Sequence, residues 1–442
     1  MTASAHTPSS TARPSQFLTI GLLALAIAVL VQLIGKLELN VGIGAIVIFP
    51  MVWGLLVGLV ISLQRIKPLS IDLQRTATAF VAVSVMLLVA RLAFNIGPSL
   101  PVLLEAGPAL LLQEIGHLLG TVALALPLAV LLRMGRATIG ATFSLDREPA
   151  FAMVSEKYGP DSDQYRGVLA MYVFGTLFGA VYITLLTSLV SNWKIFDPLA
   201  LAMGAGVGSG SMMAASAASI VSAYPAQEDA ILGMAAVSNL ITTVLGVYVG
   251  IYVALPLADR FYRFLTRRST TEADAEAPGD AEENRRFRER VAASSAEMSI
   301  PLWASLSILT LLGIATAAIA AEERSWAIVA GYLILVALLL VSIGLSRLTG
   351  RRISPIVWAT TLGALISSPW SPIGPWTAET VGAVDFLSIA TITLTCAGLS
   401  LGKDVPLLRS IGWKIVPVGL VAITASFLLS VVIAEFALGF WG

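Results

Sequence analysis

The sequence predicts an all-helical polytopic membrane protein with about 11 transmembrane helices and two re-entrant or broken helices, arranged as inverted repeats. Composition is the first observation behind this fold class. Hydrophobic residues make up 57% of the 442 residues and charged residues only 12%, whereas soluble domains carry about 25% charged residues. The mean hydropathy is +0.87. The other two observations are apolar runs of membrane-spanning length and two internal repeats.

The apolar runs are about 20 residues long, which is the length that crosses about 30 Å of hydrocarbon. In chain order they fall at 17–35, 42–63, 76–96, 108–132, 165–191, 228–257, 299–320, 325–346, 353–369, 380–400 and 411–440. The predicted parts are a disordered tail at 1–16, a first membrane bundle at 17–133, a core at 134–258, a linker at 259–298 and a second bundle at 299–442.

Charge predicts the orientation, because short cytoplasmic loops are enriched in Lys and Arg. With the N-terminus in the cytoplasm, most basic residues between the runs fall on the cytoplasmic side. The linker is acidic from Glu272 to Glu283 and basic from Arg285 to Arg290, which suits a cytoplasmic tether. We therefore expect a multi-pass protein of the inner membrane, with the N-terminus and the 259–298 linker cytoplasmic.

The same composition excludes several classes of function. The net charge is zero, with 27 basic and 27 acidic residues, so nothing indicates a nucleic-acid partner. Cys396 is the single cysteine, and His6 and His117 are the only histidines, which leaves no disulfide and no cysteine or histidine cluster for a metal. No nucleotide-binding loop or nucleophile motif is present. We expect neither an enzyme nor a resident cofactor.

One internal repeat joins the two ends of the chain. At a shift of 305 positions, Pro50–Ser62 matches Pro355–Ser367 in proline, tryptophan, glycine and serine, and Gly97 meets Gly402 without a change of register. The charge count runs the two spans in opposite directions across the membrane. An inverted repeat of this kind is typical of secondary transporters.

A second repeat lies in the core, where two breakable segments, 136–160 and 199–223, each precede a long apolar helix. At a shift of 66 positions Gly140 meets Gly206, and Tyr158 meets Tyr224. Glycine holds a helix poorly, and non-helical backbone at membrane depth survives only inside protein or beside a wet cavity. We therefore expect two re-entrant hairpins that face a cavity; the alternative, which the charge count equally allows, is that each segment crosses the membrane.

The candidate substrate-binding residues lie in both segments. In the second, we expect a helix to start at Met212 and its N-terminal amides to face an anion. The residues of this group are Gly208, Ser209, Gly210, Ser211 and Met212. In the first, the candidates are Thr142, Ser144 and Arg147. The alternatives are that small residues only permit close helix contact, and that the first segment is a solvated cytoplasmic loop.

The candidate ion-coupling residues are polar groups within apolar runs. They are Asp146, Glu148, Asn239, Thr242, Glu114 and His117. Asn239 and Thr243 share a helix face and offer oxygens to Na⁺, whereas Glu114 and His117 are three residues apart and suit a proton or ion relay. The alternatives are interhelical hydrogen bonds and a structural Glu–His pair.

Several motifs carry a resemblance to a known family. They are Gln113–Gly120, Ile139–Ser144, Arg147–Pro149, Glu156–Gly159, Arg166–Gly167 and Gly206–Met213. With them, the central third of the chain resembles a bacterial inner-membrane family catalogued only as a domain of unknown function (number 3100). More loosely, the broken helices and inverted repeats are similar to elevator-type carriers of the bile-acid, glutamate and 2-hydroxycarboxylate symporter kind. That resemblance implies a small organic anion moved with Na⁺ or H⁺. The broken segments are adjacent in mid-chain here, so no ligand residue is carried over from those carriers.

Together these features predict a secondary transporter of a small carboxylate or amino acid, coupled to Na⁺ or H⁺, that works by alternating access. The core would move against a scaffold of the repeated end bundles, where a homodimer interface would also lie. The alternative is a non-transporting membrane regulator or a channel-like export factor.

Overall fold

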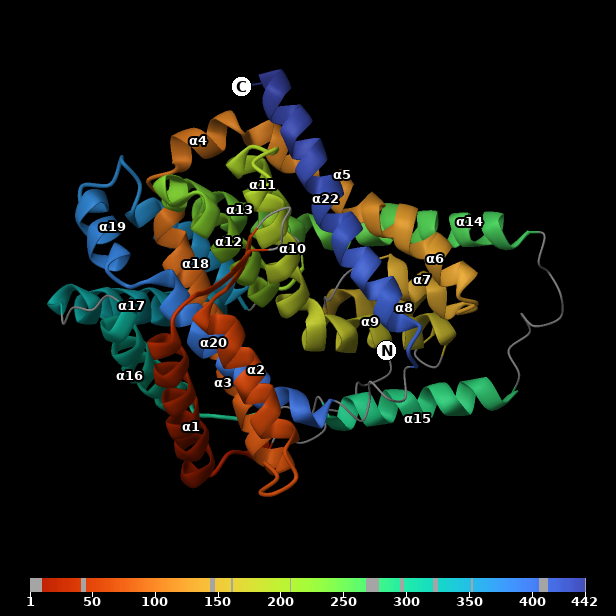
Figure 1. Cartoon of the computed structure of the whole chain (residues 1–442), viewed down its shortest axis with the longest axis horizontal. Helices are drawn as coiled ribbons and strands as arrows, with labels where there is room; N and C mark the ends of the chain where they lie inside the picture. The colour runs from red at the N-terminus through yellow and green to blue at the C-terminus, as the bar shows by residue number, and fades with distance from the viewer. Residues whose placement is uncertain are drawn as a thin grey trace. The chain divides into compact units, whose positions relative to one another are not determined.

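The computed structural model describes residues 10–40, 45–143, 148–159, 162–206, 208–267, 278–294, 298–320, 325–350, 353–404 and 412–441. This part of the chain is almost entirely helical (Figure 1). Its strands form two short ribbons, β1 (Ser10–Thr11) with β4 (Met298–Ser299), and β2 (Leu37–Asn40) with β3 (Ala45–Ile48). The prediction of an all-helical fold is confirmed.

Within the described residues, eight helices are long and apolar enough to cross a membrane. They are Pro14–Ile34, Ile71–Ile96, Gly107–Leu131, Asp163–Asn192, Leu302–Ala320, Trp326–Leu348, Phe386–Lys403 and Ile415–Gly439. Helices of this length and composition make the chain a multi-pass membrane protein.

Two of the expected spans are shorter than predicted. In place of 42–63 there is α2 (Pro50–Leu63), and in place of 353–369 there is α18 (Pro355–Ile366). Both helices begin at a proline, which fits the first helical position because it lacks an N–H that would be unpaired there. Residues 45–48 before α2 are a strand, and Ser354 caps α18 by accepting from the N–H of Val357 at 3.4 Å.

The chain divides into two compact units that do not follow chain order. The first unit comprises Met1–Glu38, Ile48–Leu100 and Ala293–Lys403, and the second unit comprises Leu39–Val47, Pro101–Ala292 and Asp404–Gly442. Each unit therefore takes segments from both halves of the sequence.

The helices of the first unit are α1 (Pro14–Ile34), α2, α3 (Ile71–Ile96), α16 (Leu302–Ala320), α17 (Trp326–Leu348), α18, α19 (Gly374–Gly382) and α20 (Phe386–Ser400). Here α2 packs against α20, α18 packs against α3, and α3 packs against α20. The 305-position register equates α2 with α18 and α3 with α20. Under that register, the contact of α2 with α20 is therefore equivalent to the contact of α18 with α3.

Two glycine residues show the same equivalence in their individual contacts. A Cβ placed on Gly97 would lie 2.6 Å from the carbonyl carbon of Ser367, and a Cβ placed on Gly402 would lie 2.5 Å from the carbonyl oxygen of Ser62. The register equates Gly97 with Gly402 and Ser62 with Ser367. Each glycine thus lies against the serine of the other copy.

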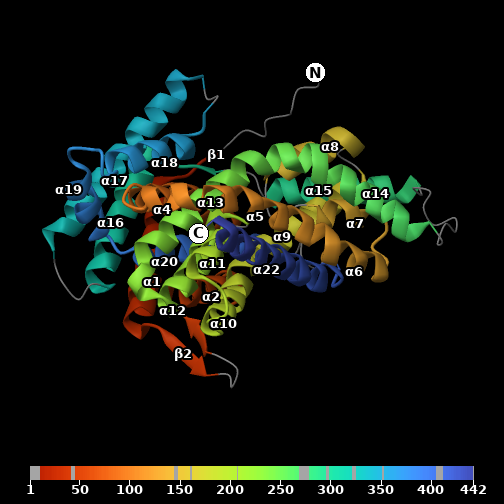
Figure 2. The same ribbon diagram turned by 90° about the horizontal axis from the view of Figure 1, so that it is seen from above.

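The helices of the second unit begin with α4 (Leu100–Glu105), α5 (Gly107–Gly120), α6 (Leu126–Leu131), α7 (Ala137–Thr142), α8 (Glu148–Tyr158), α9 (Asp163–Phe174) and α10 (Ala180–Asn192). They continue with α11 (Pro198–Ala205), α12 (Gly210–Ala223), α13 (Glu228–Val249), α14 (Leu255–Thr266), α15 (Pro278–Ser294) and α22 (Ile415–Trp441). Figures 1 and 2 both show α22 beside α5. A Cβ on Gly116 would lie 2.6 Å from the main chain of Leu429, so these two backbones approach closely.

Three π-helical turns interrupt long helices of the second unit, and the described residues contain no others. They are η1 (Thr121–Ala125), η2 (Gly175–Gly179) and η4 (Gly250–Ala254). A π-turn widens a helix locally and occurs often at functional sites. The π-turns therefore make this unit the candidate location of a functional site.

The segment expected to be a tether contains a docked helix. The side-chain amide of Asn284 in α15 donates to Asp163 at 2.7 Å, and Arg166 pairs with Glu283 at 2.8 Å. Phe287 is only 1% exposed, and the Arg166 guanidinium lies 5.6 Å from its ring centre. At least this part of 259–298 is anchored to the start of α9.

Candidate functional site

The helices α11 and α12 form a hairpin whose two ends meet. Asp197 caps α11 by accepting from the N–H of Leu199 at 2.7 Å. At the end of α12, the Tyr224 hydroxyl donates to the main-chain oxygen of Phe196 at 3.4 Å. The Lys194 ammonium donates to the main-chain oxygen of Ala223 and lies 3.5 Å from the centre of the Tyr224 ring. The chain therefore leaves this hairpin where it began.

Burial raises the pKa of the Tyr224 phenol, and the nearby carboxylates of Asp197 and Glu435 raise it further. Burial is likewise the main reason that the pKa of Tyr158 at the end of α8 is raised, with Asp259 second. Both tyrosines are therefore neutral hydrogen-bonding groups at physiological pH.

The tip of the hairpin is the non-helical stretch that the glycine run predicts. α11 ends at Ala205, and Gly208 has a φ of +83°, a conformation that favours glycine. Ser209 caps α12 by accepting from the N–H of Met212 at 3.4 Å, and its hydroxyl lies 3.0 Å from that of Ser211. The helix starts at Gly210, so the expected start at Met212 is wrong by two residues, because Ser209 is the better cap.

The five candidate substrate-binding residues at this tip differ in how deeply they are buried. Ser209, Gly210 and Ser211 are half-buried. Gly208 is buried, and Met212 is 1% exposed. A Cβ on Gly179 would lie 2.8 Å from the Met212 sulfur, so Met212 packs against the π-turn after α9. Access to the amide end of α12 is therefore through Ser209, Gly210 and Ser211.

Side chains of α13 hold the loosened end of α11. The Ser238 hydroxyl donates to the main-chain oxygen of Met203 at 2.7 Å. The Asn239 amide donates to the oxygens of Gly206 at 2.8 Å and Gly208 at 3.2 Å. Carbonyls that the break removes from helical hydrogen bonding are thus paired within the protein, as apolar surroundings require.

These bonds bear on the candidate Na⁺ ligands. Since the nitrogen of Asn239 faces the hairpin, only its amide oxygen can serve as a cation ligand. The Thr243 side chain is exposed, and its hydroxyl donates to the main-chain oxygen of Asn239 at 2.7 Å. Among the described residues, no three His, Cys, Asp or Glu side chains gather as a metal site.

A second set of candidates meets deep in the unit. Glu114 and His117 on α5 are 3% and 2% exposed, and Thr242 on α13 is fully buried. The Thr242 hydroxyl lies 2.7 Å from Glu114 Oε2 and also within reach of the main-chain oxygen of Ser238, at 2.9 Å. The structure therefore brings Glu114 and Thr242 together and links them to the helix that holds the hairpin.

His117 faces a different neighbour, the helix α22. Its Nδ1 lies 2.5 Å from the hydroxyl of Ser426, which in turn donates to the His117 main-chain oxygen at 3.1 Å. One turn earlier, Ser430 donates to the main-chain oxygen of Gln113 at 3.1 Å. The Gln113 side-chain amide is fully buried and has no hydrogen-bond partner within the described part of the chain. Sequence analysis missed this seam between α5 and α22.

The first breakable segment packs differently from the second. Gly140 of α7 lies against Gln164, in the first turn of α9, and Gly167 lies against Ala137. In the second copy, by contrast, Gly206 lies against Ser238 and Asn239 in the middle of α13. The 66-position register is therefore not kept in the helix contacts.

Little of the predicted site in the first segment lies within the described residues. Thr142 is fully buried and its hydroxyl donates to the main-chain oxygen of Thr138 at 2.9 Å. Ser144, Asp146 and Arg147 lie outside the described residues, as does the side chain of Glu148 at the start of α8. The site built here consequently rests on the second segment.

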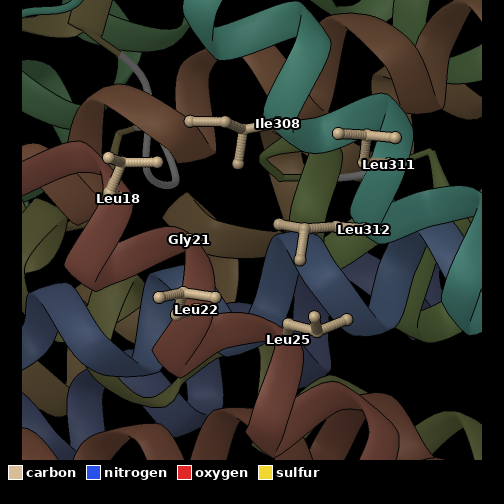
Figure 3. A pocket seen from close by; sticks show the side chains of 7 residues that line it. All are labelled: Leu18, Gly21, Leu22, Leu25, Ile308, Leu311 and Leu312. Atoms are coloured by element: carbon tan, nitrogen blue, oxygen red, sulfur yellow. The ribbon is translucent and has the colours of Figure 1, made fainter. Parts of the chain in front are cut away.

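A groove of ≈ 190 Å³ lies in the first unit between α1 and α16 (Figure 3). Its lining is Leu18, Gly21, Leu22, Leu25, Ile308, Leu311 and Leu312. None of these side chains can bind an anion or a cation. The groove is therefore separate from the polar site.

No curated protein and no solved structure matches the chain. A family model described as a protein of unknown function (DUF3100) matches residues 29–264, which is more than half of the chain. The matched range includes the Glu114 helix, both breakable segments and α13, and the resemblance drawn from their motifs is confirmed. The chain belongs to this family of proteins of unknown function, DUF3100.

Proposed function

We propose that this protein is a secondary active transporter of a small organic anion, a carboxylate or an amino acid, coupled to Na⁺ or H⁺. The observation that carries the proposal is the α11–α12 hairpin, which turns back at a non-helical tip and ends where it began. Broken helices of this kind form the binding sites of secondary transporters. In the membrane the hairpin would be re-entrant.

The anionic group of the substrate would lie at the start of α12. This helix has 14 residues and no acidic side chain in its first turn, so no carboxylate of that turn neutralises its positive end. The half-buried amides of Gly210 and Ser211 and the hydroxyls of Ser209 and Ser211 are the donors. Backbone amides at a helix start favour carboxylate and phosphate groups.

The coupling cation would bind beside this tip. Glu114 is an ionisable residue buried inside a helix of membrane-spanning length. Such a residue is energetically costly in the membrane and is rarely found there without a function. Through Thr242 it is one hydrogen bond from α13, whose Ser238 and Asn239 hold the hairpin. Asp146, Glu148 and Arg147 stay predictions for the first segment.

Alternating access of the elevator type is supported by the reciprocal contacts of the first unit. Gly97 lies against Ser367 and Gly402 lies against Ser62, as expected for two copies related by a two-fold operation. We propose that this unit is the inverted-repeat scaffold, that it also forms a homodimer, and that the second unit carries the substrate. The protein would lie in the inner membrane with its N-terminus and the 259–298 linker in the cytoplasm.

Counterflow in proteoliposomes tests the proposal. A panel of small carboxylates and amino acids is offered to vesicles preloaded with the same compound, with and without Na⁺. At least one should exchange and saturate, and Ser209→Leu should abolish that exchange. Ser354→Leu is the matched control, because Ser354 caps α18 with the same 3.4 Å geometry but is exposed in the first unit.

Conductance without saturation or exchange would instead support the channel-like alternative. Exchange that ignores both Ser209→Leu and Asn239→Ala would show that the hairpin tip is not the site.

A further inference from the structure

The hydroxyl of Thr242 has one hydrogen and lies within bonding distance of two acceptors. One is Glu114 Oε2 at 2.7 Å and the other is the main-chain oxygen of Ser238 at 2.9 Å. If Glu114 is ionised, the hydroxyl donates to the carboxylate. If Glu114 is protonated, its own O–H donates to the Thr242 oxygen and the Thr242 hydrogen turns to Ser238. Both protonation states of Glu114 are therefore hydrogen-bonded without any movement of the backbone.

We propose that Glu114 is the proton carrier of the transport cycle, so that the coupling ion is H⁺. This inference rests on the proposed transport function and identifies its driving ion. In one cycle the carboxylate takes up one proton from water on one side of the membrane and releases it on the other. The Glu114–Thr242 bond reverses its direction at each step and is never lost.

The same chain of bonds reaches the hairpin. Thr242 touches the Ser238 carbonyl, the Ser238 hydroxyl donates to Met203 near the end of α11, and Asn239 donates to Gly206 and Gly208 at the tip. A proton on Glu114 therefore changes the hydrogen bonding of α13, a helix that holds the substrate loop. A buried carboxylate far from the tip would have no such path.

A second observation concerns Gln113, the residue before Glu114 on α5. The Gln113 side chain is fully buried, and its amide has no hydrogen-bond partner within the described part of the chain. A buried amide in this position is normally satisfied by water. Gln113 thus adds a second buried polar group to the turn of α5 that carries Glu114.

Few titratable groups lie near enough to replace Glu114 in this role. On α5 itself His117 is one turn away and bonds to Ser426 of α22. The other titratable groups on helices packed against α5 lie at helix ends or in η4 and α13; they are Glu435 of α22, Asp197 before α11, Glu228, Asp229 and Tyr248 of α13, and Tyr252 of η4. His117 is accordingly the competing proton site, and the test includes it.

Infrared spectroscopy of the purified full-length protein tests the carrier without a substrate. During a pH titration, the C=O stretch of a protonated carboxyl should appear in the wild-type protein and be missing from Glu114→Gln. Glu105→Gln is the matched control, because Glu105 is an exposed glutamate at the end of α4.

A second variant tests the partner of the carboxyl. Thr242→Val should shift the C=O band to higher frequency, because the protonated carboxyl loses the hydroxyl oxygen that accepts its hydrogen bond. Thr243→Val should leave the band unchanged. Should Glu114→Gln fold poorly, the Thr242→Val shift decides alone. Titration spectra of Glu114→Gln identical to the wild type, or a band lost only in His117→Gln, would overturn the proposal.

A transport measurement separates this inference from the function beneath it. In Na⁺-free vesicles, a gradient of about one pH unit should support about tenfold accumulation by the wild type for one proton per substrate. Glu114→Gln should lose that accumulation, whereas the exposed control Glu105→Gln should keep both accumulation and counterflow exchange. Accumulation that persists in Glu114→Gln, or that follows only a Na⁺ gradient, overturns the proton carrier and leaves transport intact. If the wild type shows the infrared band but exchanges none of the candidate compounds, that result contradicts the transport function and, with it, the coupling role of Glu114.

Discussion

The hydroxyl of Tyr224, the residue after α12, donates to the main-chain oxygen of Phe196, which precedes α11. A helical segment that crossed a membrane would place these two residues about 30 Å apart. Their contact makes 198–223 a closed hairpin instead of a span. The Lys194 ammonium adds a hydrogen bond to Ala223 and lies over the Tyr224 ring. Lys194 therefore contributes most of the polar contacts that close the hairpin.

Lys194→Met should destabilise the protein more than Tyr224→Phe. Tyr224→Phe removes one long hydrogen bond, worth about 0.5 kcal/mol, and keeps the cation over the ring. Lys194→Met removes that cation, worth about 0.5–2 kcal/mol, together with the bond to Ala223. Thermal unfolding measured by tryptophan fluorescence gives the order, with Tyr252→Phe as an exposed control. Equal unfolding temperatures for Lys194→Met and the wild type would mean that this clasp does not hold the hairpin.

Asn239→Ala should weaken both stability and exchange. The variant removes the Asn239 donor from the carbonyls of Gly206 and Gly208, and a buried carbonyl that loses its donor costs about 1–3 kcal/mol. Asn192→Ala is the control, because that amide also donates to a carbonyl, of Ser188 at 2.8 Å, but within its own helix. Loss of stability should exceed that of Asn192→Ala, and exchange should fall only in Asn239→Ala. Identical behaviour of the two variants would contradict the role of Asn239 at the tip.

The reciprocal contacts of the first unit predict a matched pair of variants. Gly97→Val and Gly402→Val each force a side chain against the main chain of the opposite copy, and overpacking of this kind typically costs about 1–3 kcal/mol. Their unfolding temperatures should fall by similar amounts. Gly344→Val is the control, since a Cβ there meets nothing within 4 Å. A large effect at one glycine and none at the other would argue against two equivalent copies.

Phe287, and not the salt bridge beside it, should hold α15 on α9. Glu283 is 57% exposed where it pairs with Arg166, and an exposed pair is worth about 0–1 kcal/mol. Phe287 is 1% exposed, and removing a buried phenylalanine costs about 3–5 kcal/mol. Limited proteolysis should therefore cut 278–294 readily in Phe287→Ala and little faster than wild type in Glu283→Gln. The exposed Phe264→Ala serves as control, and equal protection of Phe287→Ala would contradict the docking.

The sequence allowed the class and the break at Gly206–Ser209 to be predicted, because both depend on local composition. It also singled out Asn239 and Thr242 as polar groups, but not the hairpin carbonyls and the Glu114 carboxyl to which they bond. The α5–α22 seam could not be predicted, since His117 and Ser426 are 309 residues apart, and the polar i, i+4 pairs Gln113/His117 and Ser426/Ser430 do not by themselves say which helices face each other. The docking of α15 was not predicted because Phe287 is the single aromatic residue in the highly charged segment 278–294. The close contact of α7 with the first turn of α9 was not predicted either. It arises because Gly140 of α7 and Gly167 of α9 face the opposite helix, and periodicity alone does not show which helix a glycine faces.

Water and substrate should reach the amide end of α12, and a single cysteine placed there reports on this access. Since Cys396 is the only native cysteine and is buried, Ser211→Cys in a Cys396→Ala background gives one reporter. Ser219→Cys, 2% exposed on the same helix, is the buried control. We expect a water-soluble maleimide to label Ser211→Cys in the membrane, a transported carboxylate to slow this labelling, and Ser219→Cys to stay unlabelled. Equal lack of labelling at both positions would show that the hairpin is packed dry, and the carrier assignment would be wrong.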